Sequence, residues 1–231
     1  MVRLVGSRAG PAGERSYDVA GNPPVRLDPK TRSVGASERD EAARADGREP
    51  VSSVDVRRLV FVDERGPHTR LARLYAWAPR AQRAQVHVPR HHGKNTTLVA
   101  ALTGDGIQAP WTLEGAMDTA AFVVYIREVL APTLRPGQLV ILDNLSVHHA
   151  APIHPLIDAR GCQLLYFPAY SPDLTPIEQA FSKIKAHLRR LAARTRDALL
   201  DALARALNTI TPTDAHGWFG YAGYTTLAPS P

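Results

Sequence analysis

The segment QLVILD at residues 138–143 constrains the fold of this chain more than any other segment. An unbroken apolar run with β-branched residues and a polar residue at each end is typical of a strand buried on both faces of its sheet. Such a strand needs a layer of helices on each side of the sheet. The run therefore predicts an α/β domain. The composition, with 44% hydrophobic and 22% charged residues, excludes collagen, coiled-coil and repeat architectures.

The pattern on either side of this run extends the prediction to a whole domain. Apolar, β-branched runs predict further strands at 57–64, 70–79, 85–89, 96–104, 106–115 and 162–168. Helical periodicity predicts helices at 118–134, near 149–160 and from 175 onward. Strands that first follow one another and then alternate with helices indicate a mixed sheet covered on both faces, in a domain over residues 54–217.

The two ends of the chain lack this pattern. Residues 1–53 are interrupted by prolines and glycines, contain one aromatic residue, Tyr17, and show no sustained period of 2 or 3.6. A segment of that kind buries too little apolar surface to offset its ordering entropy, so it is predicted to be irregular and disordered. Residues 218–231 are predicted to form a small C-terminal tail.

The charge balance favours a partner that carries phosphates. The chain has 28 Lys and Arg against 22 Asp and Glu, which gives a formal net charge of +6. Most of the basic residues are Arg, whose planar guanidinium fits phosphate oxygens. A GC-rich coding sequence would produce the same excess of Arg, and composition leaves both explanations open.

Cysteine usage and hydropathy indicate the compartment. A single cysteine, Cys162, excludes an internal disulfide and a cysteine-based zinc site. The first residues lack the apolar stretch of a signal peptide, and no run approaches the roughly 18 apolar residues that span a membrane. These features predict a cytoplasmic protein without a membrane partner.

Three acidic residues stand where the predicted elements end or begin. Asp63 ends the first strand of the domain and Asp143 ends the long apolar run, and ligands of α/β sheets gather at such carboxyl ends. A turn or cap role for either aspartate alone is the simpler explanation. Glu178 follows Thr175 and Pro176 in a pattern that predicts a capping box at the start of a helix.

The same helix can also direct Glu178 toward the sheet. An apolar stripe that must face the sheet is formed by Ile177, Phe181, Ile184, Leu188 and Leu191. Glu178 lies at the edge of this stripe, so its carboxylate can reach the end of the sheet. If it met Asp63 and Asp143 there, divalent metal ions would relieve the repulsion between the three carboxylates.

Three segments that contain these acids carry motifs of a known family. They are VFVDERG at 60–66, VILDNLSVHH at 140–149 and YFPAYSPDLTPIEQAFSKIK at 166–185. Together they resemble the catalytic domain of the mariner-type DDE transposases of bacterial insertion sequences, a family that favours the 34 residues found here between the last two acids. The resemblance extends from Val54 to Tyr224. It implies a ribonuclease H-like fold with a mixed five-stranded sheet and helices on both faces.

The resemblance also implies a site and its chemistry. Asp63, Asp143 and Glu178 would be the catalytic triad and the ligands of two Mg²⁺ or Mn²⁺ ions. Water would first free an element end, and the exposed 3′-hydroxyl would then attack target DNA, which makes the chain an endonuclease and strand transferase. Asn144 would orient Asp143. His148 would contact the outer shell of the metal or the scissile phosphate, and a cap on the following helix is an equal alternative for it.

Basic residues close to these acids are predicted to bind DNA. Residues 65–94 contain seven Lys and Arg and no acid, and two lysines follow Glu178 on its helix. A solvated basic face is the alternative. The predicted DNA-binding residues are Arg65, Arg70, Arg73, Arg80, Arg83, Arg90, Lys94, Lys183 and Lys185.

Two features separate the chain from complete members of the family. Residues 1–53 are too short and irregular for the helix-turn-helix region that recognises element ends, so the chain resembles the catalytic half alone. Arg65 stands where the family commonly has Ser or Thr. Two alternatives therefore stay open: a catalytically silent remnant that binds DNA or regulates a full transposase, and a ribonuclease H-like nuclease.

The same resemblance implies partners and two reserve ligands. The expected partners are element-end and target DNA, a second copy of the chain on that DNA, and a separately encoded N-terminal half, all at the nucleoid in the cytoplasm. Glu64 and Asp173 lie close to the triad in sequence and are the next choices as metal ligands.

Overall fold

A computed structural model describes residues 15–17, 25–27, 51, 53–73, 75, 78, 83, 85–90, 95–167 and 174–224. The chain divides into two units, Met1–Ser37 and Glu38–Pro231. In the first unit, strand β1 (Arg15–Tyr17) pairs antiparallel with β2 (Val25–Leu27). The sequence predicted no regular structure there, because pairing over three residues needs only local backbone hydrogen bonds and produces no hydrophobic period. The rest of 1–50 lies outside the described residues, so predicted disorder stays a prediction.

The second unit is built on a five-stranded mixed sheet in the order β5-β4-β3-β6-β7. β3 lies at its centre, antiparallel to β4 and parallel to β6, while β4 pairs antiparallel with β5 and β6 parallel with β7. The strands are β3 (Leu59–Arg65), β4 (Thr96–Thr103), β5 (Gly106–Glu114), β6 (Leu139–Asp143) and β7 (Gln163–Phe167). The predicted five-stranded mixed sheet is therefore confirmed.

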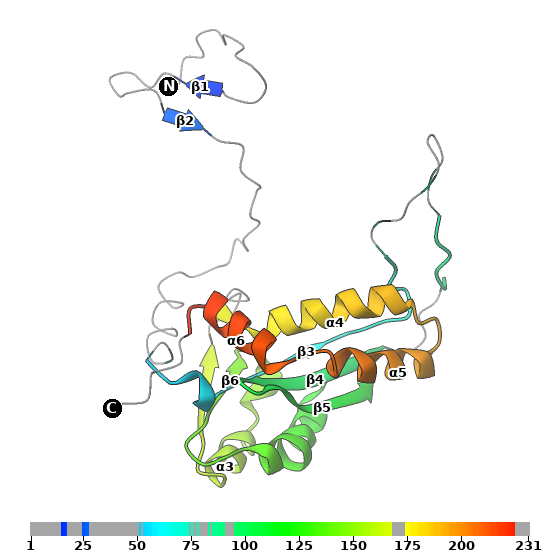
Figure 1. Cartoon of the computed structure of the whole chain (residues 1–231). Helices are drawn as coiled ribbons and strands as arrows, with labels where there is room; N and C mark the ends of the chain where they lie inside the picture. Colours follow the sequence, from blue (N-terminus) through cyan, green and yellow to red (C-terminus); the bar gives the residue numbers. More distant parts are fainter. Residues whose placement is uncertain are drawn as a thin grey trace, which may run out of the picture. The chain divides into compact units, whose positions relative to one another are not determined.

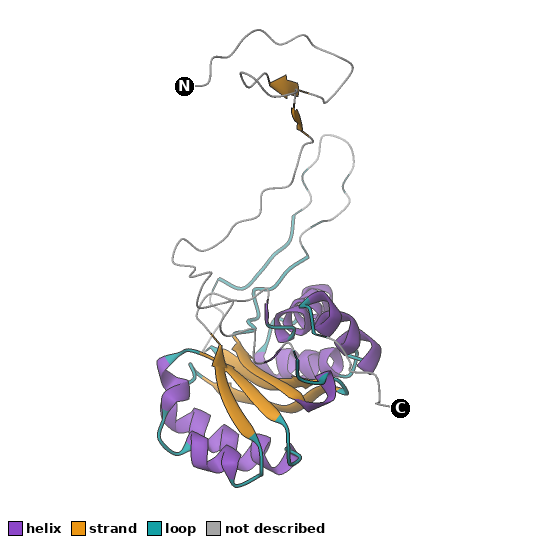
Figure 2. Ribbon diagram, turned by 90° about the vertical axis from the view of Figure 1, so that its left-hand side faces the viewer, coloured by secondary structure: helices purple, strands orange, loops and turns teal. Residues whose placement is uncertain are grey.

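Helices cover both faces of this sheet (Figures 1 and 2). One face carries α4 (Ile177–Leu191), α5 (Arg196–Leu207) and α6 (Pro212–Tyr221). The other carries α2 (Thr119–Val124), the π-helix η2 (Tyr125–Leu130), the 3₁₀ turn η3 (Ala131–Thr133) and α3 (Ile153–Asp158). Two more 3₁₀ turns are η1 (Val56–Arg58) and η4 (Ser146–His149). None of the described helices combines the length and apolar character that a membrane span requires.

Alternation along the strands divides the buried side chains into two cores. Leu59 and Phe61 of β3 belong to the core under α4, α5 and α6, whereas Val60 and Val62 belong to the core under α2, η2 and α3. β6 follows the same rule. Successive side chains of a strand point to opposite faces, so the residue number in these two strands tells which face a side chain enters.

Two predicted strands are wrong. Of residues 70–79, those that the structure describes form no strand, and residues 85–89 form none either. Their alternating apolar residues imitate the period of a strand, but Val86 and Val88 are 60% and 38% exposed and enter neither core. Periodicity without a partner strand gave a false signal at both places.

The C-terminal part of the domain extends beyond its predicted boundary at residue 217. That boundary falls inside α6, and Phe219 and Tyr224, from the predicted tail, are buried against Phe61 with ring centroids 5.7 and 5.3 Å from its own. The Tyr224 hydroxyl donates a hydrogen bond to the Leu174 carbonyl at 2.8 Å. The predicted apolar stripe on α4 is also one residue too long, since Leu191 is 42% exposed.

We expect Gly161→Ala to destabilise the domain by about 1–2 kcal/mol. Gly161 adopts φ +68° between α3 and β7, and a Cβ there would lie 3.3 Å from the Cβ of Pro136. Urea denaturation measures the loss. Gly217→Ala is the matched control, because a Cβ in the middle of α6 would meet nothing within 4 Å and adds up to about 1 kcal/mol of helix propensity. Equal effects of the two changes would contradict the backbone explanation.

Candidate active site

Parallel pairing of β3 with β6 brings the first two acids level with each other. The register pairs Leu59 with Leu139 and Phe61 with Ile141, so two residues further along it reaches Asp63 and Asp143. Both acids have odd residue numbers, like the residues of β3 and β6 whose side chains enter the core under α4, so their side chains lie on that face. The two predicted acids therefore sit at the carboxyl ends of neighbouring strands and on one face of the sheet.

Glu178 lies in the first turn of α4, which packs on that same face through Ile177 and Phe181. The helix begins after Pro176 and has no side-chain hydrogen bond at its N-cap, so the predicted capping box is not formed there. Instead, the Glu178 carboxylate contacts the guanidinium of Arg65, with 3.5 Å between Oε2 and Nη1. Arg65 has the same parity as Asp63, which places it on the face of the acids.

The three acids interact electrostatically around Asp63. The pKa of the Asp63 carboxyl is raised to about 7, and burial is the largest cause. The negative charges of Glu178, Asp143 and Glu64 act in the same direction as burial. The backbone N–H of Glu64 donates to Asp63 Oδ1 at 2.7 Å and opposes the rise. A carboxyl with this pKa holds its proton near neutral pH until an opposite charge arrives.

His148 lies between Asp143 and Glu64 and is 1% exposed. Its Nδ1 is 2.6 Å from Asp143 Oδ1, and its Nε2 is 3.3 Å from Glu64 Oε2. Burial by itself lowers the pKa of the imidazole, but the hydrogen bonds to the two carboxylates outweigh burial and raise the pKa to about 9. With an acceptor at each nitrogen, the ring is a buried imidazolium. The structure thus places His148 in direct contact with a predicted metal ligand.

Asn144 has a different partner from the one predicted. Its Oδ1 lies 2.6 Å from Nε2 of His149, and the His149 ring stacks on Tyr166 with centroids 4.1 Å apart. The hydrogen bond to Asp143 Oδ1 from this loop comes instead from the backbone N–H of Leu145, at 3.3 Å. Asp173, the other reserve ligand, lies outside the described residues.

The donor set suits Mg²⁺ or Mn²⁺, because three carboxylates offer only oxygen ligands. Within the described ranges, however, no three His, Cys, Asp or Glu side chains are gathered closely enough to hold a metal ion as they stand. Two of the predicted ligands have cationic neighbours, since His148 contacts Asp143 and Arg65 contacts Glu178. Asp143 and Glu178 are therefore each in contact with a cationic side chain.

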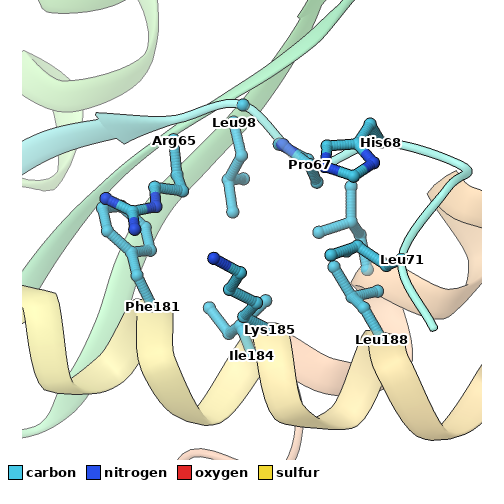
Figure 3. Close-up of a pocket in the computed structure, with 11 residues that line it drawn as sticks. Arg65, Pro67, His68, Leu71, Leu98, Phe181, Ile184, Lys185 and Leu188 are labelled. Carbon is cyan, nitrogen blue, oxygen red and sulfur yellow. The ribbon is translucent and has the colours of Figure 1, made fainter. Parts of the chain in front are cut away.

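A small apolar cavity of about 60 Å³ lies beside the acids, between the residues after β3 and helices α4 and α5 (Figure 3). Leu98, Phe181 and Ile184 are among its lining residues, and the Lys185 ammonium points between them, whereas the Arg65 guanidinium lies over Phe181 at one end. Among the described residues, none accepts a hydrogen bond from the Lys185 ammonium. The cavity therefore combines apolar walls with the Lys185 ammonium, and the Arg65 guanidinium at its end contacts Glu178.

The other predicted DNA-binding residues differ in their surroundings. Lys183 donates to Asp214 Oδ2 at 2.7 Å and to the Thr209 carbonyl at 2.9 Å, and this ammonium lowers the pKa of Asp214 to about 2. Its charge is thus used inside the fold. Arg80 and Lys94 lie outside the described residues. Four further predicted DNA-binding arginines are exposed and form no ion pair with another described residue: Arg70, Arg73, Arg83 and Arg90.

Comparison with known proteins identifies the family and the fold of this domain. Residues 58–200, more than half of the chain, match the family model of the DDE superfamily endonuclease. The transposable element Tcb2 transposase of Caenorhabditis briggsae is 24% identical over 127 residues, which are 52% of this chain and 45% of that protein. The chain thus spans less than half the length of this curated relative.

Solved structures show the same fold. The Mos1 strand transfer complex aligns with a TM-score of 0.63 and 19% identity, over 84% of this chain and 62% of that chain. The Mos1 transposase catalytic domain with Raltegravir and Mg aligns with a TM-score of 0.59 and 15% identity, over 80% of this chain and 92% of that chain. The Mos1 mariner paired-end complex with Mn aligns with a TM-score of 0.62 and 18% identity, over 83% of this chain and 63% of that chain. The predicted ribonuclease H-like fold is confirmed.

We expect Asp63→Asn to raise the melting temperature at pH 8 and to have a smaller effect at pH 5, in the presence of a chelator. The folded-state pKa of Asp63 is about 7, above the ordinary value of 3.8, so the folded protein binds the proton more tightly than the unfolded chain. Stability therefore falls as the pH rises from about 4 to 7, and asparagine removes that loss. Asp105→Asn, a change at an exposed aspartate, serves as control. A pH-independent effect of Asp63→Asn would contradict the raised pKa.

Proposed function

The chain belongs to the DDE superfamily of endonucleases, and we propose that it is a transposase catalytic domain that cuts DNA and transfers the cut strand in a metal-dependent reaction. The observation that carries this proposal is the placement of Asp63, Asp143 and Glu178 on one face of the sheet, close enough for the charges of two to raise the pKa of the third. Such coupled carboxylates at a sheet edge are typical of sites that bind divalent cations.

Each of the three acids has a defined part in the proposed reaction. Asp63, Asp143 and Glu178 would hold two Mg²⁺ or Mn²⁺ ions, which when bound activate the attacking oxygen and stabilise the leaving oxygen of the phosphodiester. Asp63 must release its proton on loading, because only the carboxylate is a ligand. Arg65 must leave Glu178, which frees its guanidinium to contact a phosphate oxygen of the substrate.

DNA is the proposed substrate and partner. Arg65 and Lys185 line one cavity, Arg65 also contacts Glu178, and exposed arginines lie on the segment after β3. Cationic groups around a carboxylate site can hold the phosphodiester backbone while the acids hold metal. By likeness to the Mos1 paired-end complexes we also propose a dimer on DNA, and a separately encoded half for recognition of the ends.

The source and place of action remain predictions. The motifs resemble those of bacterial insertion sequences, whereas the curated relative with a named organism comes from a nematode. A bacterial element, and action on the nucleoid in the cytoplasm, are therefore proposed from the motifs alone.

A catalytically silent DNA-binding remnant is the second candidate function. The contact between Arg65 and Glu178 favours it, because a guanidinium at 3.5 Å competes with a metal ion for that carboxylate. The two candidates differ in whether the chain nicks the DNA that it binds.

We expect Asp143→Ala and Glu178→Gln to lower metal-dependent DNA nicking by at least about 100-fold, since bound metal supplies several kcal/mol of transition-state stabilisation. The assay is nicking of supercoiled plasmid that carries the DNA flanking the coding gene, with Mg²⁺ or Mn²⁺. Asp105→Asn is the control and should nick like the parent. If the parent chain binds the plasmid without nicking it, the proposed endonuclease activity is overturned and the catalytically silent DNA-binding remnant is favoured. Nicking by Arg65→Ser would then show that Arg65 is the cause.

Lys183 and Lys185 are predicted to respond in opposite ways to alanine substitution. Lys185→Ala should weaken binding to a duplex oligonucleotide and reduce the slope of log affinity against log salt by about one, with an unchanged melting temperature. Lys183→Ala should lower the melting temperature, because Asp214 loses its ammonium partner, and should leave the salt slope unchanged. Fluorescence anisotropy and thermal unfolding measure the two properties. A normal salt slope in Lys185→Ala would remove this residue from the DNA surface.

A further inference from the structure

A series of polar side-chain contacts runs from Glu64 through His148 to Asp143. Glu64 Oε2 lies 3.3 Å from His148 Nε2, and His148 Nδ1 lies 2.6 Å from Asp143 Oδ1. These contacts thus link Glu64, the residue after the predicted metal ligand Asp63, with the side chain of Asp143. They join β3 to the loop that follows β6.

The His148 ring is held firmly enough to transmit position. Its ring centroid lies 4.2 Å from that of Phe122 of α2, its own carbonyl accepts a hydrogen bond from the Tyr166 hydroxyl at 2.8 Å, and it is 1% exposed. Its Nδ1 also lies 3.2 Å from the Asp143 carbonyl. A ring packed and bonded on all these sides has little freedom to turn while both acceptors remain in place.

Glu64 occupies the wrong face of β3 for a fourth metal ligand. It has the parity of Val62, which enters the core under α2, whereas Asp63 has the parity of Phe61. Its carboxylate is directed to His148 and its side chain is 20% exposed. The prediction of Glu64 as a further metal ligand rested on its closeness to Asp63 in sequence, but neighbouring residues of a strand point to opposite faces.

These contacts hold the Asp143 carboxylate in one orientation. Oδ1 contacts His148 Nδ1 in an ion pair at 2.6 Å and accepts a hydrogen bond from the backbone N–H of Leu145. Both contacts use Oδ1, and among the described residues none donates to Oδ2. Carboxylates that bind metal are usually oriented by hydrogen bonds of this kind.

We propose that Glu64 is a positioning residue of the site: it holds the His148 ring, and the ring holds Asp143 with Oδ2 free for the metal. This inference rests on the proposed function, in which Asp143 is a metal ligand. Glu64 itself touches neither metal nor DNA. Its influence on the metal passes through His148 alone.

The test measures Mn²⁺ affinity of the full chain by calorimetry. Glu64→Ala is expected to weaken Mn²⁺ binding about 10- to 100-fold, and Glu64→Gln less, because its amide oxygen still accepts a hydrogen bond from His148. In a His148→Gln background, Glu64→Ala should cause no further loss, since the connection is already broken. A loss of the same size in both backgrounds would make Glu64 a direct ligand and overturn the proposal.

A matched control and a metal-free measurement separate this proposal from the proposed function. Asp158→Asn breaks another carboxylate–histidine pair, with His154 at 2.8 Å on the surface of α3, and should leave Mn²⁺ affinity unchanged. In a crystal structure of metal-free Glu64→Ala, we expect Asp143 Oδ1 and His148 Nδ1 to separate beyond about 3.5 Å. An unchanged pair, or parental Mn²⁺ affinity in Glu64→Ala, refutes the positioning role. Absence of Mn²⁺ binding by the parent chain refutes the proposed function, and the metal-free structure then decides the positioning role.

Discussion

The parallel contact between β3 and β6 is the constraint on which the rest of the site depends. Its last pair joins Phe61 to Ile141, two residues before Asp63 and Asp143 on their strands, and strand alternation then sends both acids toward α4 rather than to opposite sides of the sheet. A shift of one residue in this register would move one aspartate into the other core and uncouple the charges. The apolar residues that precede each acid secure the register, because each must enter its own core.

Much of this arrangement was predictable, and the reasons differ between the residues. Asp63 follows the apolar run of β3 and stands two residues before that strand ends, Asp143 ends β6, and Glu178 lies in the first turn of α4. Both apolar runs and the apolar stripe of the helix are visible in the sequence, so local pattern and motif spacing located all three acids. Their coupling around Asp63 needed the sheet order. No local pattern states which strands are neighbours.

The contacts of the site's cations could not be predicted in the same way. The pairings of His148 with Glu64 and of Arg65 with Glu178 join residues separated by 84 and 113 positions along the chain. Lys183 and Lys185 look equivalent as letters two residues apart on one helix, yet Asp214 of α6 uses the charge of the first. The strand predicted at 85–89 has the converse explanation: a local period is present there, but no described strand pairs with it.

The hydrogen bond from Tyr224 to Leu174 ties the last described residue of the chain to the approach to α4. Phe219 and Tyr224 also pack around Phe61, two residues before Asp63. Expression fragments designed around the family motifs alone, with a stop codon placed soon after residue 200, would expose this aromatic cluster to water and release the anchor ahead of Glu178. The minimal recombinant unit for studying the acids therefore has to include residue 224.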